Sequence, residues 1–222
     1  MSRLIFIHGL GEEPGIFDAI APALPGEKIF IDNWKEIGAE DNAWQYAQSL
    51  VQRYAVKPDD VVIGHSLGGW VGIHMKQHSG CRVIQLASWT NPHKIIRPFG
   101  LPDSLSLWLA RNGLYFSTVV RGIIERKQYR GKPSRDLFIS TFNRLMNSER
   151  SRVVAQLHIL LNPTGHPLTV APDLRVHARG DTLVRIPDEP FAEVPGDHFM
   201  LMTFPEAVIR AILATLVSPR QV

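Results

Sequence analysis

The sequence predicts an α/β domain with a mostly parallel sheet and helices on both of its faces. Short apolar runs alternate with segments of helical periodicity along the first ninety residues. Parallel strands need crossover connections, so this alternation implies a parallel sheet with right-handed crossovers. A chain of 222 residues is long enough to bury one sizeable core. We therefore expect a single domain over residues 1–222.

The first elements follow directly from local pattern. The run Arg3–Ile7 is long enough for a buried strand, and it ends in His8-Gly9-Leu10-Gly11. Residues Phe17 to Leu24 suit a short helix, and Lys28–Asp32 suits a second strand. Asp41 or Asn42 can cap the next helix. One face of that helix carries an apolar stripe at helical spacing: Trp44, Ala47, Leu50, Val51 and Tyr54.

The segment Val61–Gly69 contains a G-x-S-x-G turn centred on Ser66. A β-branched apolar run precedes the turn, and helical residues continue to Met75. Such a strand–turn–helix holds a serine on a strained corner with its hydroxyl exposed above the sheet. The alternative is a glycine-rich turn in which the serine only caps the helix. The next strand is Arg82–Ala87.

The C-terminal part repeats the pattern of a strand followed by a polar residue. Leu174–Ala178 reads as a strand and is followed by Asp181, and the segment 191–199 carries His198. The last helix begins at Thr203-Phe204-Pro205-Glu206, a capping box with proline at the first helical position. Its apolar face comprises Val208, Ile209, Ile212, Leu213 and Leu216.

An HG loop, a serine elbow, an aspartate after a strand and a histidine after the last strand thus follow one another. This order resembles the α/β-hydrolase superfamily from residue 3 to about residue 217. The resemblance implies the α/β-hydrolase fold, trimmed to about six strands because the two antiparallel strands that open full-length members have no counterpart.

Between Asn91 and His166 the strand–helix alternation stops, and three stretches show helical periodicity: 105–109, 115–124 and 138–146. Ser134 is expected to cap the third. The resemblance implies that residues 92–166 form a helical cap inserted over the site; an ordinary helical subdomain is the compatible alternative. Such a cap would line a substrate pocket with some of its apolar side chains, drawn from Phe99, Leu101, Leu105, Trp108, Tyr115 and Phe116. Trp89, Asn91 and Trp108 are the candidate substrate-binding residues.

The same resemblance implies a catalytic triad of Ser66, His198 and Asp181. Serine is a poor nucleophile without a base, and the base needs a carboxylate to hold its tautomer. Asp188 and Glu189 lack the context of a strand end, and Asp197 adjoins His198, where neighbouring side chains usually diverge. We therefore expect Asp197 to shape the loop. The strand after the elbow ends in Ala87-Ser88-Trp89-Thr90-Asn91, which offers no carboxylate.

Two backbone N–H groups are expected to bind the oxyanion. Leu67, the residue after the nucleophile, supplies one, and the resemblance implies Leu10 for the other. His8 and His65 are interpreted as loop and packing residues. The histidines show no metal-ligand spacing, so we expect no metal and no cofactor.

Composition sets further bounds. Lys and Arg total 24 against 21 Asp and Glu, scattered without long single-sign blocks, and this balance does not indicate a nucleic-acid partner. The single cysteine, Cys81, excludes an internal disulfide. No apolar stretch approaches the ~20 residues that span a bilayer, and the N-terminus lacks the pattern of a signal peptide. We expect a cytoplasmic protein; the sequence does not indicate its oligomeric state.

These residues predict hydrolysis of an ester or thioester of an apolar acyl or aryl substrate through an acyl-enzyme. The tail Val194–Met200 with Pro205-Glu206 resembles that of thioesterase domains. Two alternatives stay open: a C–C bond hydrolase or lyase of the same fold, and a non-catalytic ligand-binding protein. Ser66 argues against the haloalkane-cleaving branch, which needs aspartate at the elbow.

Overall fold

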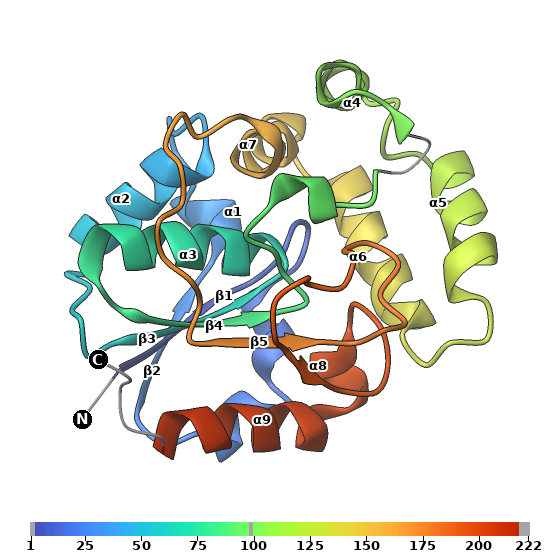
Figure 1. The fold of residues 1–222 in the computed structure, drawn as a ribbon. Coiled ribbons are helices and arrows are strands. Elements are labelled where there is room, and N and C mark those ends of the chain that lie inside the picture. Colours follow the sequence, from blue (N-terminus) through green and yellow to red (C-terminus); the bar gives the residue numbers. More distant parts are fainter. Residues whose placement is uncertain (1–2, 98–99, 218–222) are drawn as a thin grey trace.

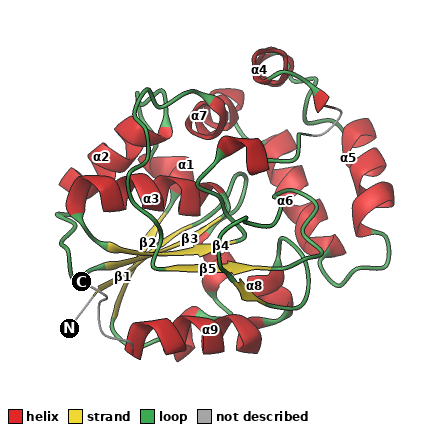
Figure 2. Cartoon of the chain, in the orientation of Figure 1, coloured by secondary structure: helices red, strands yellow, loops and turns green. Residues whose placement is uncertain are grey.

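A computed structural model describes residues 3–97 and 100–217. Its centre is a six-stranded sheet in the order β2-β1-β3-β4-β5-β6, and every neighbouring pair of strands is parallel. Helices cover both faces of this sheet (Figures 1 and 2). The predicted fold class and the predicted number of strands are confirmed. The strands are β1 Arg3–Ile7, β2 Glu27–Ile31, β3 Val61–His65, β4 Arg82–Leu86, β5 Leu174–His177 and β6 Ala192–Glu193.

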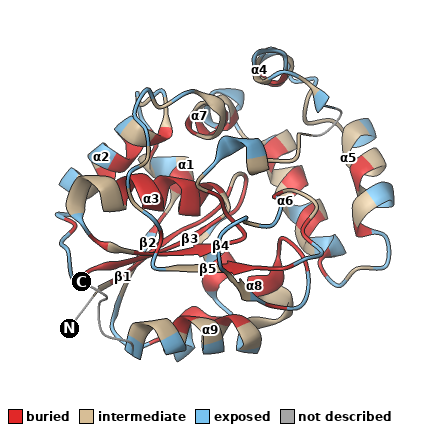
Figure 3. Ribbon diagram, in the orientation of Figure 1, coloured by how far each residue is buried: buried red, intermediate tan, exposed pale blue. Residues whose placement is uncertain are grey.

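Side chains of the central strands alternate between two apolar cores. In β1, Leu4 and Phe6 pack into one core, whereas Ile5 and Ile7 pack into the other. Successive side chains of a strand point to opposite faces, so a strand covered by helices on both sides is apolar throughout. Figure 3 shows β1, β3 and β4 coloured mainly as buried.

One face of the sheet is covered by α2 (Ala43–Arg53) and α3 (Leu67–Ser79), and α1 (Asn33–Glu36) lies beside them (Figure 1). Asn42 caps α2, because its side chain accepts a hydrogen bond from Gln45 N. The opposite face is covered by α9 (Pro205–Val217), α8 (Met200–Thr203) and the 3-10 turn η1 (Pro14–Phe17). Cys81 is buried at the start of β4, and burial raises the pKa of its thiol to about 11.

Between residues 92 and 166, the described part of the chain forms the short turn η3 (Pro92–Lys94) and four α-helices. The helices are α4 Asp103–Arg111, α5 Thr118–Ile124, α6 Arg135–Asn147 and α7 Arg150–Leu161, and a π-helical turn, η5 (Glu125–Tyr129), extends α5. The first three helices correspond to the predicted stretches, whereas α7 was not predicted. Large parts of α4 and α5 are coloured as exposed or intermediate in Figure 3.

Three local predictions are wrong: the helix over Phe17–Leu24, the cap at Ser134 and the capping box at Thr203. Phe17–Leu24 is not one helix: η1 ends at Phe17, and a second 3-10 turn, η2, spans Ala21–Ala23. Pro22, inside η2, has no N–H for a longer helix. Ser134 makes no capping bond; its hydroxyl donates to Asp197 Oδ2 at 2.5 Å.

The predicted capping box at Thr203 is also absent from its expected place. Pro205 is the first residue of α9, so Phe204 occupies the capping position. Thr203 instead ends α8, and its hydroxyl donates to Phe199 O at 3.2 Å.

Within the part of the chain that the structure describes, no helix combines the length and the apolar character needed to cross a membrane.

Candidate active site

Ser66 lies on a strained turn between β3 and α3. Its backbone has φ 51° and ψ −118°, which is rare for a residue with a side chain. The turn is tight because glycines flank it. A Cβ at Gly68 would lie 1.9 Å from Ile7 O, and one at Gly64 would lie 2.3 Å from the Gly68 carbonyl carbon. Glycine at these two positions lets the start of α3 touch the end of β1.

This close approach brings the HG loop beside the serine. A Cβ at Gly9 would lie 3.1 Å from Ser66 Cβ, so the HG loop borders Ser66. Leu67 is the first residue of α3, and N–H groups of a first helical turn have no intrahelical acceptor. Leu10 N donates no hydrogen bond to residues 3–97 or 100–217. Both predicted oxyanion donors therefore have free N–H groups near Ser66.

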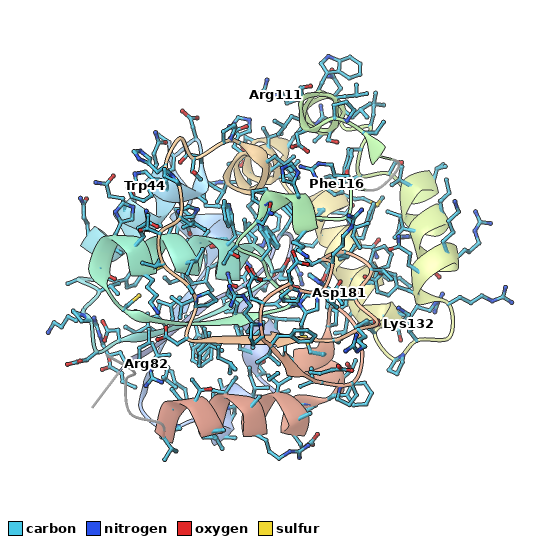
Figure 4. All side chains as sticks on the ribbon, viewed as in Figure 1. Trp44, Arg82, Arg111, Phe116, Lys132 and Asp181 are labelled. Carbon is cyan, nitrogen blue, oxygen red and sulfur yellow. The ribbon has the colours of Figure 1, made fainter. Side chains whose placement is uncertain are left out.

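Asp181 and His198 form a buried pair. Asp181 follows β5, and His198 lies in the turn between β6 and α8. His198 Nδ1 lies 2.9 Å from Asp181 Oδ2, and the two residues are 4% and 9% exposed. The other carboxylate oxygen, Oδ1, accepts from Leu183 N at 2.8 Å and Val184 N at 2.9 Å, which fixes the orientation of the carboxylate. In Figure 4, Asp181 lies near the end of β5, and Phe116 lies above Asp181 in this view.

The environment tunes the predicted base. Burial alone lowers the pKa of His198, but the charge and hydrogen bond of Asp181 outweigh it and raise that pKa above 6.5. The pKa of Asp181 is lowered: burial acts to raise it, and the charge of His198 overcomes this effect. Asp181 therefore stays ionised, as an orienting carboxylate requires.

A pH profile tests this environment. A general base must be unprotonated to accept a proton, so with a raised His198 pKa we expect kcat/KM to fall as pH drops through a midpoint above 6.5. The measurement is kcat/KM for a non-ionising ester between pH 5 and 9. Asp188→Asn is the control, since Asp188 is exposed and pairs with Lys94; it should leave the midpoint in place. An acid limb centred below 6.5 would contradict the assignment.

A second histidine–carboxylate pair lies next to the first. Glu12 Oε2 lies 2.8 Å from His65 Nδ1, and His65 Nε2 lies 2.8 Å from His198 O. Glu12 is 3% exposed and His65 is fully buried. Burial acts to raise the pKa of Glu12, but the charge and hydrogen bond of His65 lower it overall. Sequence reasoning missed Glu12 and took His65 for a packing residue; a histidine at a buried elbow was the available signal, because buried polar groups need partners.

The remaining polar residues of the region have local roles. His8 Nδ1 lies 2.9 Å from Gly9 O, and its Nε2 accepts from Asn33 N, which fits the predicted loop role. Asp197 accepts from Phe199 N at 3.1 Å and from Ser134 Oγ, and it lies 3.6 Å from Lys132 Nζ. Asp197 thus shapes the turn that carries His198 and ties it to the start of α6.

Ser66 and His198 line the same cavity, between the sheet and helices α4 to α7. Its volume is about 170 Å³. No hydrogen bond joins Ser66 Oγ to another residue of the described chain; such contacts are often long before substrate binds. Glu12 is also part of the wall. The apolar part of the wall consists mainly of Leu10, Trp89, Phe116, Ile124, Phe138, Phe142, Leu145, Leu157, Leu160 and Leu161.

The candidate substrate-binding residues separate into two groups. Trp89 lines the cavity, as do Tyr115 and Phe116 from the segment between α4 and α5. Asn91 and Trp108 do not: the Asn91 side chain accepts from His93 N at the start of η3, and Trp108 is 56% exposed. Leu101 and Leu105 are also absent from the wall, and Leu105 is 40% exposed. Phe99 lies outside the described residues.

Over residues 3–97 and 100–217, no group of three His, Cys, Asp or Glu side chains is arranged to hold a metal ion. The two histidine–carboxylate pairs are spaced for hydrogen bonds.

Comparison with known proteins gives a matching family and several similar structures. A family model described as the alpha/beta hydrolase family matches residues 4–211. No curated protein matches the chain. Solved structures with similar folds include an enol-lactonase from Burkholderia xenovorans (12% identity, TM-score 0.71, 98% of this chain and 92% of that one). An esterase from Thermogutta terrifontis (16%, 0.64, 97% and 89%) and a thioesterase from Streptomyces coelicolor (15%, 0.60, 97% and 89%) are also similar. At these identities the likeness shows the fold.

Proposed function

The chain belongs to the alpha/beta hydrolase family, and we propose that it is a serine hydrolase that cleaves an ester or thioester of an apolar acyl or aryl group. One observation carries the proposal. Ser66, on its strained turn, shares an apolar cavity with His198, whose Nδ1 lies 2.9 Å from the buried Asp181 carboxylate. A nucleophile, a base and a group that orients the base are the parts that acyl transfer requires.

In the proposed reaction His198 Nε2 takes the proton of Ser66 as Oγ attacks the carbonyl carbon. Asp181 holds the Nδ1 proton and stabilises the imidazolium that forms. The N–H groups of Leu10 and Leu67 donate to the oxyanion. His198 then gives its proton to the departing alcohol or thiol, which leaves the acyl group on Ser66. Water, deprotonated by His198, releases the acid and restores the serine.

The size and the lining of the cavity fit a small acyl or aryl group. Its volume of about 170 Å³ is close to the ~150 Å³ of an engineered apolar cavity that binds benzene. The wall is mainly aromatic and aliphatic, so it favours uncharged hydrocarbon, and each methylene that it buries contributes about 0.8 kcal/mol. We propose that residues 92–166 act as the cap that supplies most of this wall.

The experiment that tests the function is labelling with a small fluorophosphonate, followed by peptide mass spectrometry. We expect one adduct on Ser66, because the probe reacts with activated serines. A series of p-nitrophenyl esters and matched acyl thioesters of graded chain length then separates the two leaving groups. Absence of both labelling and hydrolysis would refute the proposal and favour the ligand-binding alternative.

Two residues of the proposed cap, one in the cavity wall and one exposed to solvent, allow a paired prediction. Thr141 of α6 lines the cavity, whereas Trp108 of α4 is exposed. Thr141→Phe reduces the cavity volume, so we expect the longest acyl chain that is hydrolysed efficiently to shorten by several carbons. Trp108→Ala should leave the chain-length profile unchanged. The measurement is kcat/KM against chain length, with the rate of Ser66 labelling as the control. A profile altered by Trp108→Ala and unaffected by Thr141→Phe would place the acyl group elsewhere.

A further inference from the structure

Glu12 is a buried carboxylate at the reacting centre for which the proposed reaction has no role. A Cβ at Gly9 would lie 2.7 Å from Glu12 Oε2 and 3.1 Å from Ser66 Cβ, so the carboxylate and the nucleophile flank the same glycine. Glu12 also lines the cavity that contains Ser66 and His198. A carboxylate in an otherwise mainly apolar cavity is costly unless its oxygens have partners.

The two carboxylate oxygens of Glu12 differ in their hydrogen-bond partners. Oε2 accepts from Gly9 N at 2.6 Å and lies 2.8 Å from His65 Nδ1. Oε1 has no hydrogen-bond partner among residues 3–97 and 100–217. An ionised carboxylate only accepts hydrogen bonds, and Glu12 is part of the cavity wall, so Oε1 can accept from a donor group of a ligand.

Oε2 of Glu12 is already engaged by its neighbours. Both ring nitrogens of His65 face oxygens of the protein, Glu12 Oε2 and His198 O. An anionic ligand group would be repelled by the Glu12 carboxylate, and a cationic group would lose its hydration in a mainly apolar cavity. A neutral hydroxyl meets neither penalty.

We propose that Glu12 Oε1 accepts a hydrogen bond from a hydroxyl group of the substrate, and that the preferred substrates are esters or thioesters of hydroxy acids with the hydroxyl near the scissile carbonyl. The inference rests on the proposed function and names the substrate class of the same site. Glu12 thereby acts as a specificity-determining residue, and the apolar wall holds the rest of the acyl group.

The test uses isosteric pairs in which a methyl group replaces the hydroxyl. Ethyl 3-hydroxybutanoate is compared with ethyl 3-methylbutanoate, and ethyl 2-hydroxybutanoate with ethyl 2-methylbutanoate, by kcat/KM of the wild-type protein. A hydrogen bond to a charged acceptor corresponds to about tenfold or more. We expect the hydroxy ester of at least one pair to be preferred by that factor. Equal rates within both pairs would overturn the inference and leave the proposed function standing.

A matched pair of variants assigns the preference to Glu12. Glu12→Gln keeps the shape but presents a weaker, uncharged acceptor, so the preference should fall severalfold. Glu13→Gln, the neighbouring exposed glutamate that pairs with Arg144, should keep the wild-type ratio. A Glu12→Gln variant that slows both members of each pair equally shows that Glu12 only positions Gly9 and His65, and overturns the inference.

The comparison of isosteric substrates on the wild-type protein needs no variant, so poor folding of Glu12→Gln does not remove the test. Labelling of Ser66 by a fluorophosphonate separates the two levels of the proposal. A protein that labels and hydrolyses esters without a hydroxyl preference refutes only the role of Glu12. A protein that neither labels nor hydrolyses refutes the proposed function, and this inference with it.

Discussion

Replacing Ser66 with alanine is expected to abolish ester hydrolysis and fluorophosphonate labelling while leaving the fold intact. Without the nucleophile no acyl-enzyme forms, and in a comparable serine hydrolase this change costs about 10⁶-fold in kcat. The fold should persist because Ser66 Oγ makes no hydrogen bond within the described chain, and the backbone bond from Ser66 N to Leu86 O at 2.9 Å does not need the side chain. The measurements are kcat, intact-protein mass after labelling, and the melting temperature.

Ser88 offers a matched control two positions beyond the end of β4. It is buried, and its hydroxyl donates to Ser66 O at 2.7 Å, so it is the serine most easily confused with the nucleophile. Ser88→Ala should still label at Ser66. Labelling that survives Ser66→Ala and disappears in Ser88→Ala would move the nucleophile to the neighbouring strand.

The fold was predictable because its signals are local. Alternating apolar runs and helical segments determine the parallel sheet, and Asn42 and the glycines around Ser66 are recognisable from their neighbours alone. The predicted strands and the six-stranded sheet are confirmed. One of the errors arises from competition between partners: Ser134 bonds to Asp197, 63 residues away, in preference to its own helix. No local pattern reveals such a partner.

The candidate site likewise has residues that the sequence predicts and residues that it does not. Ser66, Asp181 and His198 each stand at the end of a strand or in a turn, so sequence order predicts that they meet. The pair of Glu12 and His65 spans 53 residues, and the motifs around them do not specify either residue. The sequence of the segment 92–166 does not reveal which of its apolar side chains other elements will cover. The exposed Trp108 and the cavity-lining Phe116 therefore look equivalent in sequence, and tertiary packing separates them.

Asp181→Asn is expected to lower kcat by about 10³- to 10⁴-fold with little change in KM. The asparagine oxygen can still accept from Leu183 N and Val184 N, as Asp181 Oδ1 does at 2.8 and 2.9 Å, so the loop should keep its shape. The amide nitrogen then faces His198 Nδ1, where Asp181 Oδ2 now lies at 2.9 Å. Nδ1 must become an acceptor, and the proton moves to Nε2.

A proton on Nε2 leaves His198 unable to take the proton of Ser66, whereas substrate binding is unaffected because Asp181 does not line the cavity. The measurement is kcat and KM for one ester in Asp181→Asn, Asp188→Asn and Asp197→Asn. Asp188 is exposed and should be nearly silent; Asp197 holds the turn before His198 and should show a milder loss. A collapse of kcat in either control, with Asp181→Asn close to wild type, would assign the orienting carboxylate to that residue, because only the group bonded to Nδ1 sets the tautomer of the base.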